Sequence, residues 1–358
     1  MDDPSSSRKR KREKNRERNR RRNASRNPLR DADVFLRRTF YSIVPNKAHR
    51  IKSRELIQKV RTAIVAKFKN SEVDVYGSYG SGTALVDSDV DFCVKMETRN
   101  ALFTIRRITD ILLKIGIIVD DDLTRFDMPV PGGTVTVYFT FGLDVESGIH
   151  VDLSLNNPLA PISCAFVKAI VDFHFMEKML LVLIKYFATC HDLNNKKKGL
   201  PNTGHIYLGV HVLHKNKVIP HFLKKEHVTD LSELVQEANS YTIVAENFSK
   251  SPAVTTVASL LLDYFKYYSE DVDYTTMAIS IRGGCLVTKQ SLGWPEDETG
   301  YRLAILDPFK GDNAGERVKR GWLRRMRKAF KHAREILEDG SRFERLFEPF
   351  DFNEITIV

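Results

Sequence analysis

The sequence has few of the features that mark secreted, membrane or metal-cluster proteins. Its four cysteines show neither the C-x-x-C spacing of a zinc site nor a disulfide framework. We interpret all four as reduced thiols in a core: Cys93, Cys164, Cys190 and Cys285. No apolar run reaches the roughly 18 residues of a membrane span, and the N-terminus lacks a signal-peptide core. No internal repeat is visible, so we expect a globular, intracellular protein with no membrane partner.

Positive charge is concentrated at the N-terminal end of this 358-residue chain, whose net charge is +10. Residues 1–30 carry 13 Lys and Arg against four acids and almost no apolar side chains. Such a segment cannot offset the entropy cost of ordering, so we expect residues 1–31 to form a basic tail, disordered to about Asn27. The tail could bind RNA phosphates, its Arg8–Lys14 run could be a nuclear localisation signal, or it could serve solubility alone.

The body begins with helices and then changes to a mixture of helices and strands. Helical spacing of apolar residues predicts three helices, the second capped by Ser53: residues 33–51, 53–68 and 101–118. Short or alternating apolar runs predict four strands: residues 73–76, 90–95, 134–142 and 149–155.

After Asn157-Pro158 the pattern becomes mostly helical. We predict helices over residues 162–171, 174–190, 205–213, 230–239, 255–267 and 313–337, with a hairpin over 280–294 and a strand over 303–306. The expected fold class is therefore α+β. A small mixed-sheet domain (32–160), whose N-terminal helices could pack on the next domain, precedes a helical domain (161–340) and a C-terminal tail (341–358).

One stretch, Val73 to Lys95, combines glycines with paired acids. Strand alternation places Asp89 and Asp91 on one face of the strand over 90–95, opposite Val90 and Phe92. Close carboxylates repel each other, and a hard divalent cation suits their oxygens. Upstream, the glycines leave a backbone turn open to an anionic phosphate; they are Gly77, Gly80 and Gly82, with Ser78 between them.

A third acid lies about sixty residues later. Asp152 stands between Val151 and Leu153 in the strand over 149–155, so its side chain faces away from theirs. Three acids on two strands beside a glycine-rich turn indicate a metal and phosphate site. A calcium-like or merely solvated acidic patch is the alternative.

These residues resemble the nucleotidyltransferase superfamily of DNA polymerase β, in which a Gly-Ser turn and three acids hold two metal ions. Further motifs resemble the noncanonical poly(A) polymerases and terminal uridylyltransferases. These motifs, in the family's order, are VLIKYF (182–187), Leu193-Asn194 with Gly199, LLLDYFKYY (260–268), Gly293-Trp294, and LDPF (306–309) followed by Asn313. The resemblance covers about residues 33–337. It implies a nucleotidyltransferase catalytic domain followed by a central and poly(A)-polymerase-associated domain.

The resemblance also implies roles at the catalytic centre. Asp89 and Asp91 would bind two Mg²⁺ or Mn²⁺ ions, and Asp152 would bind metal and help to activate the 3′-hydroxyl of RNA. Gly77 and Ser78 would hold the triphosphate of the incoming nucleotide. Lys185 would contact the same triphosphate, although a lysine in an apolar helix could instead extend its stem to the surface.

The nucleotide pocket departs from the family pattern at several positions. Relatives have Ser-Ser-Tyr, with the tyrosine on the base, where this chain has Asn202-Thr203-Gly204-His205; His205 could supply a stacking face or could simply start a helix. Ser163 stands where the family has an asparagine near the ribose. The loop over the base and ribose would contain Asp307, Asp312 and Asn313.

Two positions of this loop have a further interpretation. Asn313 with Glu316 also forms a capping box for the last predicted helix. Asp312 replaces a histidine found in many uridylyltransferases, which favours ATP over UTP. The last helix carries a basic outer face that could guide RNA or could be an ordinary solvated surface.

We therefore expect a template-independent RNA nucleotidyltransferase that adds AMP to RNA 3′ ends, with UMP addition as the alternative. A synthetase of oligoadenylates or cyclic dinucleotides shares the Gly-Ser and Asp-x-Asp core, but the Asp-Pro-Phe segment argues against it. An inactive RNA-binding subunit is disfavoured by retention of all three acids. The chain has no separate RNA-recognition module, so a partner protein could supply RNA specificity. The basic tail favours the nucleus over the cytoplasm.

Overall fold

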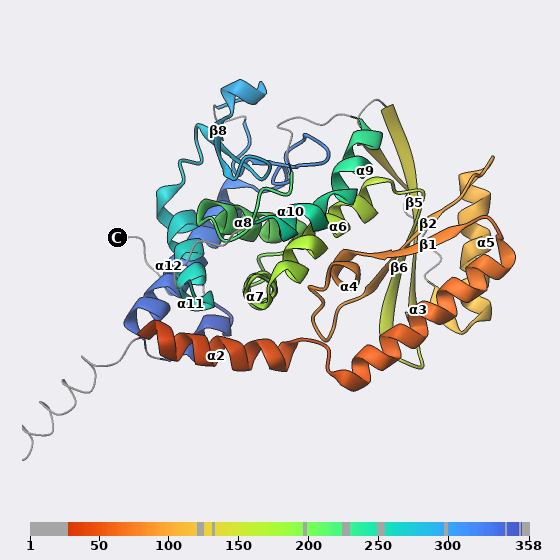
Figure 1. Ribbon diagram of the computed structural model, residues 1–358, viewed down its shortest axis with the longest axis horizontal. Helices are drawn as coiled ribbons and strands as arrows, with labels where there is room; N and C mark the ends of the chain where they lie inside the picture. Colours follow the sequence, from red (N-terminus) through yellow and green to blue (C-terminus); the bar gives the residue numbers. More distant parts are fainter. Residues whose placement is uncertain are drawn as a thin grey trace, which may run out of the picture.

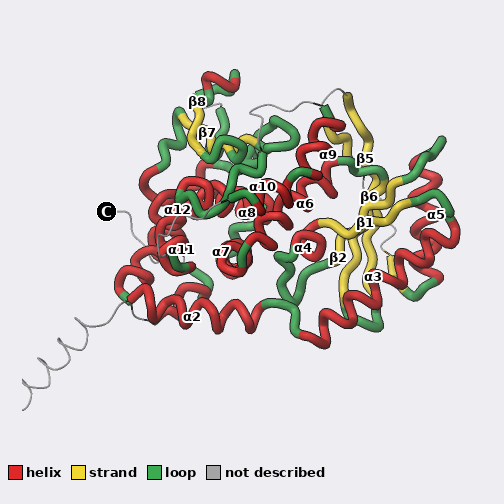
Figure 2. Tube along the Cα trace, viewed as in Figure 1, coloured by secondary structure: helices red, strands yellow, loops and turns green. Residues whose placement is uncertain are grey.

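The computed structural model describes residues 28–119, 125–130, 133–195, 199–223, 230–248, 255–296, 300–340, 342–350 and 352. The expected basic tail, including Arg8–Lys14, lies outside these residues except for its last few positions. The described chain mixes helices with two sheets, and the α+β fold class is confirmed. Figure 2 shows the strands gathered in two separate places among the helices. Within the described residues, no helix is both long and apolar enough to cross a membrane.

The larger sheet is mixed, with strand order β1-β2-β6-β5-β3 and β4 paired to β5. β2 and β6 run parallel, whereas β1–β2, β5–β6, β3–β5 and β4–β5 are antiparallel. The strands are β1 (Glu72–Tyr76), β2 (Val90–Lys95), β3 (Ile117–Val119), β4 (Arg125–Val130), β5 (Gly133–Asp144) and β6 (Ile149–Leu155). The sequence did not predict β4. It also wrongly extended a helix over β3, because Gly116 (φ +85°) turns the chain after the helix ends at Lys114.

Helices α3 (Lys47–Lys67) and α5 (Ala101–Lys114) cover one face of this sheet, and α4 (Gly77–Ser81) and α6 (Leu159–Phe173) lie on the other side (Figure 1). The predicted cap at Ser53 is wrong. α2 (Pro28–Ile43) ends before Pro45, and α3 is capped by Asn46, whose side chain accepts from the His49 N–H at 2.9 Å. Ser53 is buried inside α3, where its hydroxyl donates to the His49 carbonyl at 2.9 Å.

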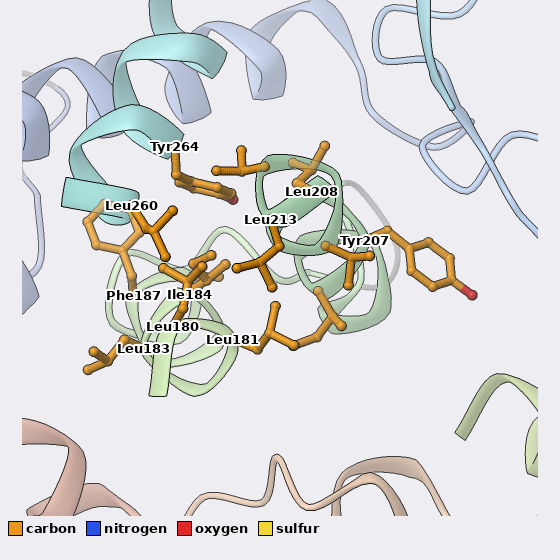
Figure 3. Packing of buried hydrophobic residues seen from close by; sticks show 14 of the residues in the cluster. Leu180, Leu181, Leu183, Ile184, Phe187, Tyr207, Leu208, Leu213, Leu260 and Tyr264 are labelled. Carbon is orange, nitrogen blue, oxygen red and sulfur yellow. The ribbon is translucent and has the colours of Figure 1, made fainter. Parts of the chain in front are cut away.

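The second part of the chain is a helical cluster around α7 (Phe175–Cys190). The side chains of residues 180–184 are at most 1% exposed, and α7 packs against α2, α6, α8 and α11. Figure 3 shows this apolar packing between α7, α8 and α11. The remaining helices here are α8 (Asn202–Lys215), α9 (Leu231–Asn239), α10 (Tyr241–Glu246), α11 (Val257–Lys266) and α12 (Arg320–Asp339). α2 belongs to this cluster through α7, α11 and α12, whereas α3 packs on the larger sheet.

A small sheet lies at the edge of the helical cluster. β7 (Met277–Ser280) and β8 (Cys285–Thr288) form a hairpin that begins three residues before the predicted range of 280–294 and ends at Thr288, and β9 (Ile305–Leu306) pairs with β7 in parallel. Cys285 is exposed at the start of β8, so its predicted core position is wrong. Cys93 is buried and Cys164 and Cys190 are partly buried, and all four thiols are free.

Candidate active site

The turn after β1 depends on glycine. Gly77 has a φ of +60°, and a Cβ at this position would overlap the Asp91 carboxylate. At Gly80 a Cβ would lie 2.7 Å from Cys164 Sγ on α6. The short helix α4 therefore lies directly against β2 and α6, and this close approach fixes the position of Ser78.

The structure brings the three predicted acids together. Asp91 and Asp152 are register partners in the parallel pair β2–β6, and Asp89 immediately precedes β2. One carboxylate oxygen of each residue lies within 4.8 Å of those of the other two. The side chains that alternate with them are fully buried on the opposite face of the sheet: Val90, Phe92, Val151 and Leu153. The apolar face anchors both strands and thereby holds the three carboxylates side by side.

Lys185 supplies a cation beside these acids. Its side chain is 7% exposed, and its Nζ lies 3.1 Å from Ser88 Oγ and 3.4 Å from the Thr83 carbonyl oxygen. Burial lowers the pKa of Lys185, whereas the charges of Asp89 and Asp91 raise it. The ammonium therefore stays inside the protein, and the alternative of a stem that extends to the surface is wrong.

A cavity of about 270 Å³, here called the carboxylate cavity, joins these groups. Its lining includes Gly77, Ser78, Asp89, Asp91, Ser163, Lys185 and Thr203. Asp152 belongs to the acid cluster through its distance to Asp89 and Asp91 but does not line this cavity. Residues of two strands and four helices thus converge on one space.

A second cavity of about 400 Å³ adjoins the first and is here called the loop cavity. Ala160, Ser163, Pro201 and Thr203 line both cavities. The rest of its lining comes mainly from the loop before α12, including Asp307, Asp312 and Asn313. The two cavities are therefore continuous across α6 and α8, and a single extended ligand could occupy both.

Hydrogen bonds within the loop determine its shape. Asp307 Oδ1 accepts from the N–H groups of Phe309 at 2.9 Å and Lys310 at 3.0 Å. Asn313 is 3% exposed; its Oδ1 accepts from the Ile305 and Gly315 N–H groups at 2.8 Å. Its Nδ2 donates to the Leu303 carbonyl at 3.0 Å. Asn313 holds the loop closed instead of capping a helix, so the predicted capping box is wrong and α12 begins seven residues later, at Arg320.

His205 does not reach either cavity. Its ring is 0% exposed inside α8, and Nε2 lies 3.2 Å from the Leu193 carbonyl oxygen. Burial lowers the pKa of His205 to about 4, so the ring is neutral. The stacking face is wrong and the alternative of a histidine at the helix start is confirmed, because the first turn of α8 directs this side chain into the helical core.

Tyr207 lines the loop cavity but was missed from the sequence. It lies one helical turn after Thr203, on the same face of α8, and this spacing could have identified it. Figure 3 shows its ring directed away from the leucine cluster. Burial and then the charge of Asp307 raise the pKa of Tyr207 well above its usual value. Lys310 and Arg317 also line the cavity.

A buried ion pair supports the loop from behind. Arg282 donates through Nε to the Pro308 carbonyl at 2.6 Å, and its Nη1 lies 3.0 Å from Glu237 Oε2 on α9. Both side chains are less than a tenth exposed. No local pattern indicated this pair, because its partners are 45 residues apart in the sequence.

The residues of the carboxylate cavity fit a divalent metal and a phosphate. Three clustered carboxylates form a donor set suited to hard cations such as Mg²⁺ or Mn²⁺. Ser78 Oγ is buried without a hydrogen-bond partner among the described residues, so a ligand oxygen could satisfy it. Together with Lys185, these groups could hold a nucleoside triphosphate and its metal ions.

Two protein-family models match the chain. One, described as the central palm domain of mitochondrial-like poly(A) RNA polymerase, matches residues 33–172. The other, described as Cid1 family poly A polymerase, matches residues 256–313. The first match contains the three acids and the Gly-Ser turn, and the second ends at Asn313 in the loop before α12.

Known proteins with similar sequences cover most of the chain. Poly(A) RNA polymerase cid11 of Schizosaccharomyces pombe is 23% identical over 329 residues, which are 89% of this chain and 66% of cid11. Terminal uridylyltransferase cid1 of the same organism is 27% identical over 322 residues, which are 82% of this chain and 76% of cid1.

The fold is also known. A solved structure of Cid1, studied for its RNA terminal uridylyl transferase activity, matches with a TM-score of 0.74 at 22% identity and covers 90% of this chain and all of that chain. The two family matches together include more than half of the residues and span both parts of the fold. The chain therefore belongs to the family of noncanonical poly(A) polymerases and terminal uridylyltransferases.

Proposed function

We propose that the protein is a template-independent RNA nucleotidyltransferase that transfers AMP from ATP to the 3′ ends of RNA. The observation that carries this proposal is the convergence of Ser78, Lys185, Asp89 and Asp91 at one cavity, with Asp152 in the same acid cluster. Because the loop cavity continues from it, a nucleotide could place its triphosphate in the first and its base in the second.

The chemistry follows from the charges in the carboxylate cavity. The RNA 3′-oxygen forms a bond to the α-phosphorus of ATP, the bond to pyrophosphate breaks, and Asp152 is the proposed acceptor of the hydroxyl proton. Mg²⁺ or Mn²⁺ held by Asp89, Asp91 and Asp152 would supply charge to the hydroxyl and to the leaving pyrophosphate. Lys185 and Ser78 would bind triphosphate oxygens and keep the nucleotide in place.

Asp312 supports ATP over UTP. It lines the loop cavity, and an ionised carboxylate only accepts hydrogen bonds. The exocyclic amino group of adenine donates, whereas the corresponding oxygen of uracil accepts and would face the carboxylate unfavourably. Ser163 and Thr203 line both cavities, a position suited to the ribose between base and phosphates.

Incubation of the purified protein with a labelled RNA and each of the four NTPs separately tests the proposal. Extension with ATP in Mg²⁺ or Mn²⁺ supports it, and extension mainly with UTP would establish the uridylyltransferase alternative. No extension with any NTP would contradict both. An exclusively short, primer-free product would indicate an oligonucleotide synthetase.

The N-terminal tail is proposed to contact RNA and to direct the protein to the nucleus. Its clustered Lys and Arg support both roles. Deletion of residues 1–27 should weaken RNA binding and lower its salt dependence, and a reporter fused to residues 1–27 should enter the nucleus. A partner protein remains our proposed source of RNA specificity, and a pull-down with the tail as bait would test for it.

A further inference from the structure

The first half of helix α3 carries an unusual concentration of exposed positive charge. Lys47, Arg50, Lys52 and Arg54 precede the first acid of the helix, Glu55, and its first turn contains no acid. Cations near a helix N-terminus oppose the helix dipole, which favours anions there. The arrangement therefore costs stability in the free protein, and a bound polyanion would offset that cost.

Lys178 of α7 lies within the electrostatic reach of two other cations, Arg50 of α3 and Lys168 of α6. Lys178 of α7 is half-buried, and burial lowers its pKa; the charges of Arg50 and Lys168 lower it further, against the attraction of Asp172. Asp172, however, already lies 2.6 Å from Lys168 Nζ. Among the described residues, Lys178 Nζ has no ion pair or hydrogen bond of its own. A phosphate would supply the missing negative charge at this point.

Exposed aromatic rings lie beside these cations. Tyr41 at the end of α2 is 60% exposed and stacks on Phe175, which is 39% exposed, with ring centroids 6.1 Å apart and planes at 23°. The Arg37 guanidinium lies 5.9 Å above the Phe175 ring. Phe40 packs edge-on beneath Phe175 at 5.3 Å and so holds the ring in place. Exposed, fixed aromatic faces are suited to stacking with unpaired bases.

This surface begins close to the carboxylate cavity. Phe175 and Lys178 are three residues apart on α7, and Lys178 precedes Lys185 by two turns, a distance of about 10 Å along the helix. A Cβ at Gly82 would lie 3.9 Å from Lys178 Nζ, and Gly82 ends the same short helix α4 that begins at Gly77. Phe175 and Lys178 therefore lie on the N-terminal half of α7, the same helix that carries Lys185 into the cavity.

We propose that this surface binds the unpaired segment of RNA that precedes the 3′ end, through its phosphates and bases. It consists of Tyr41, Arg50, Lys168, Phe175 and Lys178 and is here called the α7 surface. The inference rests on the proposed function in one respect: it takes the bound RNA to be the molecule that accepts the transferred nucleotide. Aromatic faces that alternate with cations suit single-stranded nucleic acid better than an acidic protein. Such stacking and phosphate contacts do not depend on the base sequence of the RNA.

Fluorescence anisotropy with labelled oligo(A), in EDTA and without NTP, tests the inference. Arg50→Gln with Lys178→Gln should weaken binding of an RNA of about 15 nucleotides roughly tenfold and lower the slope of log K against log salt by about 1.4, the value for two phosphate contacts. Tyr41→Ala should weaken binding by about tenfold without changing this slope.

Helix α5 offers matched controls. Phe103 is 59% exposed with Arg107 5.7 Å above its ring, and Arg106 is exposed nearby. Phe103→Ala and Arg106→Gln should leave binding unchanged. Equal losses in these controls, an unchanged salt slope, or polyglutamate competing as well as oligo(A) would overturn the inference. Because binding is measured without nucleotide or metal, the result does not depend on whether the protein extends RNA.

Discussion

The carboxylate cavity and the loop cavity are adjacent but are built in different ways. The charged and phosphate-binding groups of the first come mainly from one stretch, residues 76–91, joined by Lys185 from α7, while α6 and α8 supply a wall shared with the second. The second is assembled from three segments far apart in the chain, on α6, α8 and the loop before α12. The positions of the acids and of Ser78 in the carboxylate cavity follow from strand alternation and glycine turns. The shape of the loop cavity depends instead on tertiary packing.

From this difference we expect the carboxylate cavity to carry out the transfer and the loop cavity to select the nucleotide. The acids are anchored by fully buried side chains on the opposite face of the sheet, so the arrangement of the three carboxylates is rigid. The loop is held by Asn313, which binds its backbone from the cavity wall, and by Arg282, which binds the Pro308 carbonyl and is itself paired with Glu237. Changes in the first cavity should therefore abolish transfer, and changes in the second should alter which nucleotide is transferred.

The largest effect is expected at Asp89. Asp89→Asn removes a charge from the proposed metal site and should lower extension by at least about 10³-fold, while thermal unfolding stays unchanged because no core side chain is lost. Asp87→Asn is the matched control, since Asp87 is exposed and lies outside the cavity. Extension by Asp89→Asn at the wild-type rate would contradict the site assignment.

Lys185→Met should lower kcat/KM for ATP by about 10²-fold, because it removes the buried cation that we propose binds triphosphate oxygens. The folded protein should be as stable as before or more stable, since the substitution relieves the cost of burying a charge. Steady-state kinetics and thermal unfolding measure the two effects. Loss of stability together with activity would indicate a structural role alone.

Asp312→Asn should change selectivity with little effect on total activity. The amide can donate to the uracil oxygen, so the ratio of kcat/KM for ATP to that for UTP should fall by about tenfold. Glu316→Gln, which lines the same cavity, is the control and should leave the ratio unchanged. An unchanged ratio in both variants would place base selection elsewhere in the loop cavity.

The last expected effect is on stability and not on transfer, and it concerns α8, the helix behind the loop cavity. Burial lowers the pKa values of His205, His211 and His214 to about 4, below the usual 6.5. As pH falls from about 6.5 to 4, the unfolded chain takes up more protons than the folded one. Unfolding free energy should therefore fall by up to about 1.4 kcal/mol per pH unit for each histidine.

Urea unfolding at several pH values measures this slope. His211→Gln should reduce it, and His150→Gln should not, because His150 is exposed on β6. An equal slope in all three proteins would show that the buried histidines do not control acid stability.

The sequence was most informative where structure is local. The strands that carry Asp91 and Asp152 were predicted within one residue, and Asp89 directly before the first of them, because alternation directly reports a buried face. Caps were less predictable: Asn46, not Ser53, starts α3 because Pro45 interrupts the preceding helix. His205 and Asn313 are both neighbours in sequence of residues that line the cavities. Packing turns the His205 side chain into the core, whereas the Asn313 side chain forms hydrogen bonds with the backbone of the loop. No local pattern encodes those partners.

The central claim is that three carboxylates and a phosphate-binding turn form one metal-dependent transfer centre. Electron paramagnetic resonance of Mn²⁺ binding, in the presence of a non-hydrolysable ATP analogue, tests it without requiring activity. We expect Mn²⁺ to bind the wild-type protein and to bind Asp91→Asn at least about tenfold more weakly, with Asp87→Asn unchanged. Equal Mn²⁺ affinity in all three proteins would contradict the account.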